Sequence, residues 1–536
     1  MSLNRSSRPG SPVQTALARH GALLFLCLTV AFVAYVRIRL ADVPLERDEG
    51  EYAYAGQLLL QGIPPYKLAY NMKFPGTYYA YSVILAIFGQ TPRGVHLGLL
   101  AINVATIVIV LFLGRRLVGS FGGGVASATY AVMSLDRWVL GVFAHATHFV
   151  VLPALAAFLL LFRAVESRRA IDFFAAGALV GIAVLMKQHA VFFGVLAVAM
   201  AFSMKSSDGD YSRDRSGTRR AALVLAGSVV PPLVTCLVLA WEDVFPQFVF
   251  WTFQYATEYV SQTTVSFGVA MLRFAIREIT QASVWLWALS AAGLATLGMA
   301  HVGSGARVFL IGLLVASCAA IVPGFFFREH YFILLLPAAA LLTGSFLVYV
   351  EDVAGTVMTP IAARVCAVAI LAGAVGAFVV HESDYLFSMT PDDVSRTRYG
   401  TNPFIEAVVV AESIRKDTGA DDRIAVIGSE PEIYFYSNRK SATGYIYTYP
   451  LMEPQRYASS MQDEMIMEIE GARPKYVVFV TVATSWLTRP DSDDRILKWA
   501  NAFTKACYDE VGAPDLRNLV STFRRRSDAP DCVATR

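Results

Sequence analysis

Long apolar runs dominate the first 380 residues of the chain. A helix needs about 20 apolar residues to cross about 30 Å of hydrocarbon. Runs near that length occur at 17–39, 94–114, 119–140, 145–163, 171–187, 189–204, 220–240, 281–301, 306–323, 329–350 and 360–381. The pattern predicts a polytopic α-helical membrane protein with about eleven spans. The run at 77–89 is shorter, and we expect a helix there that does not cross.

The pattern changes near Tyr385, beyond which charged residues and prolines occur throughout. The elements predicted there alternate in type: helix 404–417, strand 423–427, helix 461–470 and strand 475–480. Apolar strands separated by helices predict a small parallel sheet. We therefore divide the chain into a membrane module, residues 1–384, and a soluble α/β domain, residues 385–536.

Ser429 to Glu432 follow the carboxyl end of the first predicted strand. Open α/β sheets bind ligands at this position. The same residues also suit an ordinary helix cap and turn, which we favour.

Composition agrees with a membrane protein: of 536 residues, 55% are hydrophobic and 16% are charged. The net charge of +3 gives no indication of a nucleic-acid partner. Arg5, Arg8 and Arg19 precede the first apolar run, which we interpret as an uncleaved signal anchor. Cys507 and Cys532 in the soluble domain could form a disulfide in an oxidising exterior.

Basic residues orient the chain, because short cytoplasmic loops are enriched in lysine and arginine. Such residues occur at Arg115-Arg116, at Arg163 with Arg168-Arg169, in the loop 205–220 and at Arg307. We expect a multi-pass protein of the cell (inner) membrane, with a cytoplasmic N-terminus and an extracytoplasmic C-terminal domain. Trp251 and Tyr255, in the aromatic stretch 245–259, could cover a site or bind sugar faces, but we favour interfacial anchors.

This orientation places four groups of unusual polar residues on the outer face. They are the loop 40–76 with Asp48, Glu49 and Lys73, the turn at His145 and His148, the turn Lys187-Gln188-His189, and the segment Phe325–Tyr331. A single polar residue at a helix end is usually an interfacial anchor. Four such groups on one face favour a shared functional site.

The acidic cluster Glu46-Arg47-Asp48-Glu49-Gly50-Glu51-Tyr52 directly follows the first span, where ionisable groups are functional candidates. With the later Lys73-Phe74-Pro75, it resembles the first external loop of the C-type (GT-C) glycosyltransferases. The nearer relatives are the protein O-mannosyltransferases and the aminoarabinose transferases that modify lipid A. The chain resembles the bacterial members of this superfamily. Leu185-Met186-Lys187-Gln188 and His330-Tyr331-Phe332 add to the resemblance, which covers roughly residues 17–381.

The resemblance implies an inverting transfer of a sugar from a polyprenyl-phosphate carrier to a lipid, glycan or protein acceptor. Asp48 matches the catalytic acid position of the family, with Glu49 beside it. The implied ligands of the donor phosphate are Lys73, Lys187, Arg328, His330 and Tyr331. Candidate contacts to the acceptor or the sugar are Glu51, Tyr52, His145 and His148.

The paired-acid motif with which oligosaccharyltransferases hold a divalent cation is not reproduced. His145 and His148 alone are a weak zinc signal. We therefore expect metal-independent transfer without a cofactor. A transporter or lipid flippase is the alternative, although such proteins place charges at the bilayer midplane within internal repeats. An inactive scaffold with a sensory external domain also stays open.

Overall fold

The computed structural model describes residues 27–204, 213–299, 301–512 and 520–528. Arg5, Arg8, Arg19 and Cys532 lie outside the described residues, as do residues 205–212 of the loop 205–220. The chain forms two compact units. Unit 1 comprises Met1–Leu40, His96–Thr235 and Thr263–Ser388, and unit 2 comprises Ala41–Val95, Cys236–Gln262 and Met389–Arg536.

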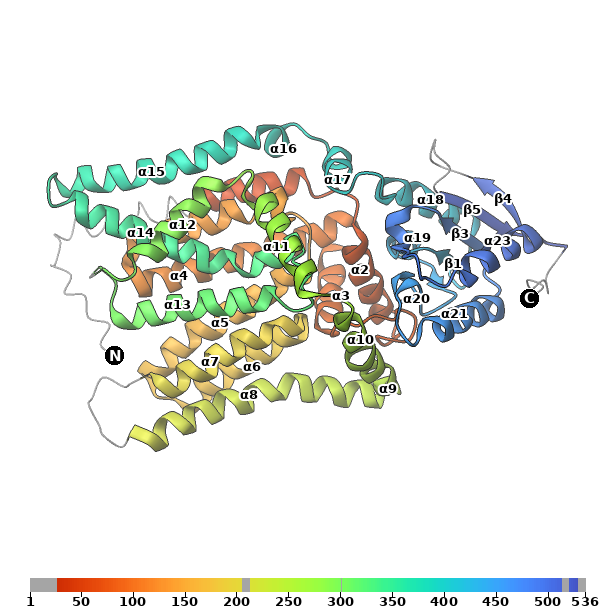
Figure 1. Ribbon diagram of the computed structural model, residues 1–536, viewed down its shortest axis with the longest axis horizontal. Coiled ribbons are helices and arrows are strands. Elements are labelled where there is room, and N and C mark those ends of the chain that lie inside the picture. The colour runs from red at the N-terminus through yellow and green to blue at the C-terminus, as the bar shows by residue number, and fades with distance from the viewer. Residues whose placement is uncertain (1–26, 205–212, 300, 513–519, 529–536) are drawn as a thin grey trace. The chain divides into compact units, whose positions relative to one another are not determined.

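Unit 1 is helical (Figure 1). A helix described from residue 27 to residue 39 is followed by α4 (Pro92–Met133), α5 (Ala146–Ser167), α6 (Ala170–Met186), α7 (Val191–Ser203), α8 (Arg213–Trp241), α11 (Val265–Thr280), α12 (Val284–Thr296), α13 (Ser304–Ile321), α14 (Leu336–Ala354), α15 (Pro360–His381) and α16 (Ser383–Phe387). Short helices η1 (Arg137–Val139), η2 (Gln188–Ala190) and η4 (Glu329–Leu334) connect some of them. Within the unit, α5 packs along α6 and α12 packs along α14.

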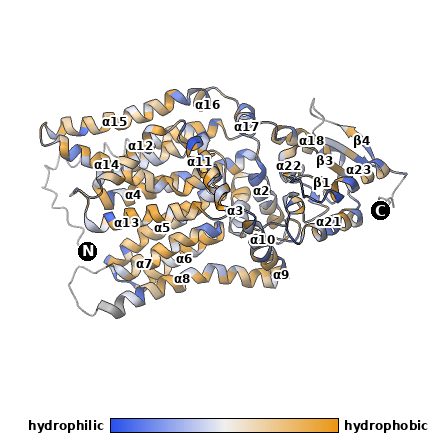
Figure 2. Ribbon diagram, viewed as in Figure 1, coloured by the Kyte–Doolittle hydropathy of each residue, from blue (hydrophilic) through white to orange (hydrophobic). Residues whose placement is uncertain are grey.

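Six described helices are long and apolar enough to cross a membrane, and four more are apolar but shorter. Figure 2 shows the predominance of hydrophobic residues along these helices. The predicted polytopic fold is confirmed, with local differences in where helices begin and end. The predicted spans 94–114 and 119–140 meet at Gly119, whose φ of 86° and ψ of 174° break α4, a conformation that glycine adopts readily. The predicted span 329–350 becomes α-helical only at Leu336.

The second of the two spans in α4 ends at Met133 rather than at 140. Asp136 caps the short helix η1, because its carboxylate accepts a hydrogen bond from the Trp138 amide at 2.9 Å. Leu140 then adopts a left-handed conformation, with φ of 57°. Residues 134–145 therefore form a compact turn before α5.

Unit 2 combines helices from three stretches of the sequence. They are α2 (Arg47–Leu60), α3 (Gly76–Phe88), α9 (Phe245–Val249), the π-helix η3 (Phe250–Tyr255), α10 (Ala256–Ser261), α17 (Pro391–Tyr399), α18 (Phe404–Asp417), α19 (Glu432–Ser437), α20 (Tyr449–Met452), α21 (Ala458–Ala472), α22 (Ala483–Trp486) and α23 (Arg495–Cys507). The predicted helix 404–417 coincides with α18, and 461–470 lies within α21.

A five-stranded sheet in unit 2 has the order β2-β1-β3-β5-β4. Its strands are β1 (Arg423–Ile427), β2 (Lys440–Ser441), β3 (Tyr476–Val480), β4 (Tyr508–Gly512) and β5 (Val520–Arg525). Strand β1 pairs in parallel with β2 and with β3, in a register that runs from Ile424 opposite Tyr476 to Ile427 opposite Phe479. The predicted parallel strands are confirmed. The antiparallel pairs β3–β5 and β4–β5 were not predicted.

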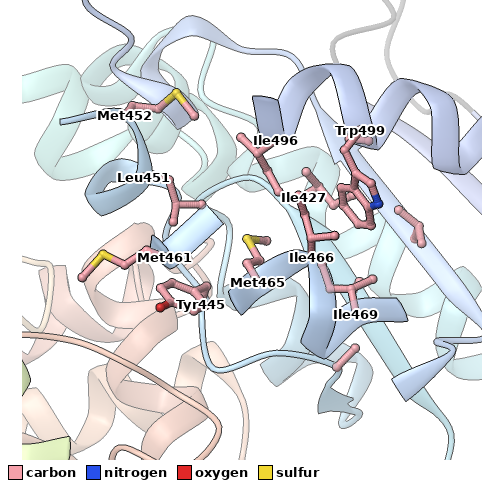
Figure 3. Close-up of a cluster of buried hydrophobic side chains, with 14 of the residues drawn as sticks. Ile427, Tyr445, Leu451, Met452, Met461, Met465, Ile466, Ile469, Ile496 and Trp499 are labelled. Carbon is pink, nitrogen blue, oxygen red and sulfur yellow. The ribbon is translucent and has the colours of Figure 1, made fainter. Parts of the chain in front are cut away.

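The core of unit 2 lies against this sheet. Figure 3 shows side chains of α21, such as Met465 and Ile469, together with Ile427 and Trp499. Trp251 and Tyr255 are buried in the same core, so the expectation that they anchor the membrane interface is wrong. Cys507 is buried and takes part in a disulfide.

Candidate active site

The acidic helix α2 is fixed at its first turn by a capping box. The Glu46 carboxylate accepts a hydrogen bond from the Glu49 amide at 2.9 Å, and the Glu49 carboxylate accepts one from the Glu46 amide at 3.2 Å. Both side chains are buried. Glu49 therefore stabilises the start of the helix, and Asp48 and Glu51 are the acids of this turn that face Lys73.

Lys73 binds both of these carboxylates. Its Nζ lies 2.8 Å from Oδ1 of Asp48 and 2.6 Å from Oε2 of Glu51. Asp48 and Glu51 are three residues apart and therefore share one face of the helix. Although burial lowers the pKa of Lys73, the two carboxylates raise it well above its usual value. The lysine is a permanent cation between two acids.

Glu51 and Tyr52 complete the surroundings of the ammonium group. Glu51 is fully buried and accepts a hydrogen bond from the hydroxyl of Tyr78 at 2.5 Å. Burial raises the pKa of Glu51, and Lys73 partly offsets this effect. The Lys73 Nζ lies 4.5 Å from the centroid of the Tyr52 ring, within the range of a cation–π contact. The side chains of Asp48 and Lys73 keep 27% and 25% exposure, so the cluster is accessible.

The loop that carries Lys73 is anchored to the C-terminal part of unit 2. The amide of Tyr70 donates to the Gly444 carbonyl at 2.7 Å, and its hydroxyl donates to Glu468 at 3.1 Å. The Tyr70 ring stacks on Trp251 with centroids 5.4 Å apart. The Tyr66 hydroxyl donates to the carbonyl of Lys73 itself at 2.7 Å. These contacts hold the lysine in place opposite α2.

Arg47 joins the start of α2 to the carboxyl end of β1. Its Nη2 lies 2.8 Å from Oε1 of Glu430, and its Nε donates to the carbonyl of Ser429. The other Glu430 oxygen accepts a hydrogen bond from the Ser485 hydroxyl at 2.8 Å. Ser429 and Glu430 do not cap α19, whose N-cap is Pro431 without a side-chain hydrogen bond. The favoured cap interpretation is therefore wrong, because these side chains bind Arg47 and its neighbours.

Glu432 lies beneath the acidic helix without a hydrogen-bond partner for either carboxylate oxygen among the described residues. It is fully buried, and burial together with the nearby Glu430 raises its pKa well above the usual value. A Cβ atom added to Gly50 would lie 2.7 Å from the Cβ of Glu432. Glycine at position 50 therefore allows α2 and α19 to pack closely.

Unit 1 contains a second group of the predicted residues. The rings of His145 and His330 stack with centroids 4.1 Å apart. Tyr331 contacts His330, with centroids 4.8 Å apart, and the Lys187 Nζ lies 4.0 Å from the Tyr331 ring centroid. The structure thus brings together three segments that the sequence singled out.

The remaining predicted residues of unit 1 lie differently. Arg328 is exposed and stands over the ring of Phe326, 5.7 Å from its centroid. His148 is buried in the first turn of α5. Sequence reasoning missed Arg37, whose Nη2 donates to the carbonyls of Ser134 at 2.8 Å and Gly141 at 2.9 Å. Arg37 therefore fixes the turn that precedes His145.

The sequence was compared with protein-family models, and the structure with solved structures. Residues 73–216 match the family model described as dolichyl-phosphate-mannose-protein mannosyltransferase. ArnT from Cupriavidus metallidurans bound to undecaprenyl phosphate superposes with a TM-score of 0.60 at 14% identity, over 97% of this chain and 99% of that chain. The chain has the C-type glycosyltransferase fold. No curated protein matches its sequence significantly.

An archaeal oligosaccharyltransferase shares this fold. AglB from Archaeoglobus fulgidus, in complex with an inhibitory peptide and a dolichol-phosphate, superposes with a TM-score of 0.55 at 12% identity, over 95% of this chain and 74% of that chain. The predicted resemblance is confirmed at the level of the fold: the chain has the C-type glycosyltransferase fold, and its residues 73–216 match a mannosyltransferase family model.

Proposed function

We propose that this C-type glycosyltransferase moves a sugar from a polyprenyl-phosphate carrier to an acceptor at the outer face of the membrane. The observation that carries the proposal is the pairing of Lys73 with Asp48 and Glu51 at the start of α2. The similar ArnT structure holds undecaprenyl phosphate and the similar AglB structure holds a dolichol-phosphate, which supports a donor of this class.

In the proposed reaction, a nucleophilic oxygen or nitrogen of the acceptor attacks the anomeric carbon of the sugar. The bond from that carbon to the phosphate oxygen breaks, and its electron pair leaves with the carrier phosphate. Asp48 takes the proton of the acceptor as general base, and the anomeric configuration inverts. A base must be in its carboxylate form, which an adjacent ammonium group stabilises. In the proposal, the Lys73 ammonium group has this role for Asp48.

The leaving phosphate needs cations, because charge develops on its oxygen as the bond breaks. We assign this role to Lys73, Lys187 and Arg328, with hydrogen bonds from His330 and Tyr331. Lys187 is well suited, since the Tyr331 ring holds its ammonium group. His145, His148, Glu51 and Tyr52 stay candidate contacts to the sugar or acceptor. Metal independence also stays a prediction, and transfer in the presence of a chelator checks it.

Asp48→Asn tests the proposed base, because asparagine has the size of aspartate but cannot accept the proton. We expect transfer from a polyprenyl-phosphate sugar by the purified protein to fall at least about a hundredfold. Donor binding and thermal unfolding should stay nearly unchanged. Asp42→Asn is the matched control, since Asp42 is an exposed carboxylate of the same unit that pairs with Arg93.

Near-normal turnover in Asp48→Asn would contradict the assignment of the base. A wild-type protein that releases no sugar from the donor, yet moves the donor between the leaflets of a vesicle membrane, would favour the flippase alternative. A protein that does neither would favour an inactive scaffold.

A further inference from the structure

Tyr447 extends from the C-terminal part of unit 2 to the candidate base. Its hydroxyl donates to the carbonyl of Arg47 at 2.9 Å and lies 3.4 Å from Oδ1 of Asp48. The side chain is buried, and its ring centroid lies 5.8 Å from the Lys73 Nζ. Tyr447 is thus in contact with the carboxylate, with the residue before it and with the cation that binds it.

We propose that Tyr447 is a positioning residue for Asp48, which fixes the orientation of the carboxylate that accepts the proton. The inference rests on the proposed function of Asp48 as the base. The 2.9 Å hydrogen bond holds the backbone at Arg47, the residue directly before Asp48, and the hydroxyl oxygen lies 3.4 Å from the carboxylate. A base must be held close to its productive geometry, because small displacements reduce the rate strongly.

The segment that carries Tyr447 is rigid enough for this role. The amide of Thr448 donates to the Ser429 hydroxyl at 3.0 Å, and its own hydroxyl donates to the Ser485 carbonyl at 2.8 Å. On the other side of Tyr447, the amide of Gly444 donates to Glu468 at 3.0 Å. The chain is therefore bound to the α/β fold directly after Tyr447 and three residues before it, and supporting contacts of this kind fix a functional side chain.

Other groups of unit 2 also interact with the Asp48 carboxylate and contribute to the pH dependence of the proposed transfer. Among the described residues of unit 2, the charged and titratable side chains that interact electrostatically with Asp48 include Lys73, Glu51, Tyr52, Tyr81, Tyr399 and Tyr447. Of these, Lys73 and Tyr447 place a polar atom within 3.5 Å of Oδ1. Removal of the Tyr447 hydroxyl leaves the contact of the Lys73 ammonium group with Oδ1 in place.

Tyr436 provides a matched control. Its hydroxyl accepts a hydrogen bond from the amide of Leu45 at 2.7 Å, just before the acidic helix. Tyr447→Phe and Tyr436→Phe each remove one hydroxyl that holds the entry to α2. Only Tyr447 contacts the Asp48 carboxylate. A merely structural role would therefore affect both variants alike.

The test compares both variants with the wild-type enzyme, using the full-length protein and a polyprenyl-phosphate sugar. For Tyr447→Phe we expect kcat to fall about three- to tenfold, with the donor KM changed less than about twofold. The acid limb of the pH–rate profile should move to higher pH, because loss of the polar hydroxyl beside Oδ1 destabilises the ionised carboxylate. Tyr436→Phe should leave the acid limb unchanged. Both variants should lose similar thermal stability.

An unchanged kcat and acid limb in Tyr447→Phe would overturn the positioning role, as would equal changes in the two variants. Two further measurements, on the wild type and on Asp48→Asn, distinguish failure of this inference from failure of the proposed function. If the wild type transfers no sugar, the proposed function fails and the positioning role fails with it. If Asp48→Asn is active, Asp48 is not the base and Tyr447 positions no catalytic group.

Discussion

Arg47 and Glu430 are separated by 383 positions in the sequence, yet Nη2 of the arginine lies 2.8 Å from Oε1 of the glutamate. The exposed fractions of their side chains are 12% and 0%. The pair joins the first turn of α2 to the end of strand β1. The C-terminal part of the chain therefore helps to hold the helix that carries Asp48.

Glu430→Gln should destabilise the protein, because it leaves the largely buried guanidinium group without its counter-charge. Loss of one partner of a buried pair costs about 3 kcal/mol. The matched control is Glu406→Gln, which removes the exposed pair of Glu406 with Arg396 and should cost less than about 1 kcal/mol. Thermal unfolding in detergent measures both. Equal losses in the two variants would show that the pair of Arg47 and Glu430 contributes no more than a surface pair.

Lys73→Ala should weaken binding of the donor phosphate and also reduce stability, since Glu51 then stays buried without its cation. The double variant Lys73→Ala, Glu51→Gln separates the two effects. We expect it to regain most of the lost stability, because no buried charge is left unpaired. Its donor affinity, measured by titration of the detergent-solubilised protein, should stay low. Donor affinity that returns together with stability would argue against a phosphate contact by Lys73.

Stability should fall as the pH rises from about 4.5 to about 7, because of Glu453. Burial raises the pKa of this carboxyl from 4.5 to about 7 in the folded protein, although the Tyr255 hydroxyl, 2.6 Å away, partly offsets the effect. Below pH 4.5 the group is protonated in both states and costs nothing. Between the two values only the unfolded chain loses the proton, so folding is disfavoured. The loss is at most about 3 kcal/mol, since one pKa unit corresponds to about 1.4 kcal/mol.

Glu453→Gln should flatten this part of the stability profile, because the amide does not titrate. Unfolding temperatures measured at intervals from pH 4.5 to 8 give the slope for both proteins. An unchanged slope in the variant would assign the pH dependence to other groups.

Single cysteines introduced at Gln61 and at Asp491, in separate variants, should both be labelled from outside the membrane. Both are exposed and belong to unit 2, so one compact unit carries both sites. In a background without the free cysteines Cys27, Cys236, Cys318 and Cys366, an impermeant thiol reagent should reach both from outside the membrane. Protection of both would invert the proposed orientation. Labelling of one alone would contradict their shared unit.

Much of the fold could be predicted because membrane spans and buried strands have strong local patterns. Helix α15 begins and ends at the predicted residues, Pro360 and His381. Strands β4 and β5 were missed, since β4 is mostly exposed and β5 contains consecutive arginines, which give no clear alternation. The break at Gly119 lies where the second of two separately predicted spans begins, just after Arg115-Arg116.

The candidate site was predictable only where a local motif carries it. Asp48 and Lys73 were singled out by the acidic cluster and the Lys-Phe-Pro element, and the structure places them in contact. The roles of Glu430, Tyr447 and Glu468 were not predicted, because these residues reach the first loop from nearly 400 positions away. Local sequence carries no record of such contacts. The one available signal was Ser429–Glu432 at the end of a parallel strand, where the sheet does bind a charged group.

The construction of unit 2 from three distant stretches has a consequence for biosynthesis. A ribosome adds roughly 5–20 residues per second, so Glu430 is made roughly 20 to 80 s after Arg47. During that interval helix α2 is already synthesised, while strand β1 and the segment that carries Tyr447 do not yet exist. A nascent chain that stops before Met389 contains Asp48, Glu51 and Lys73 but none of the C-terminal residues that hold them. Premature termination after the last predicted span should therefore abolish transfer and expose the acidic helix to proteolysis, although every residue of the acid and lysine cluster has been translated.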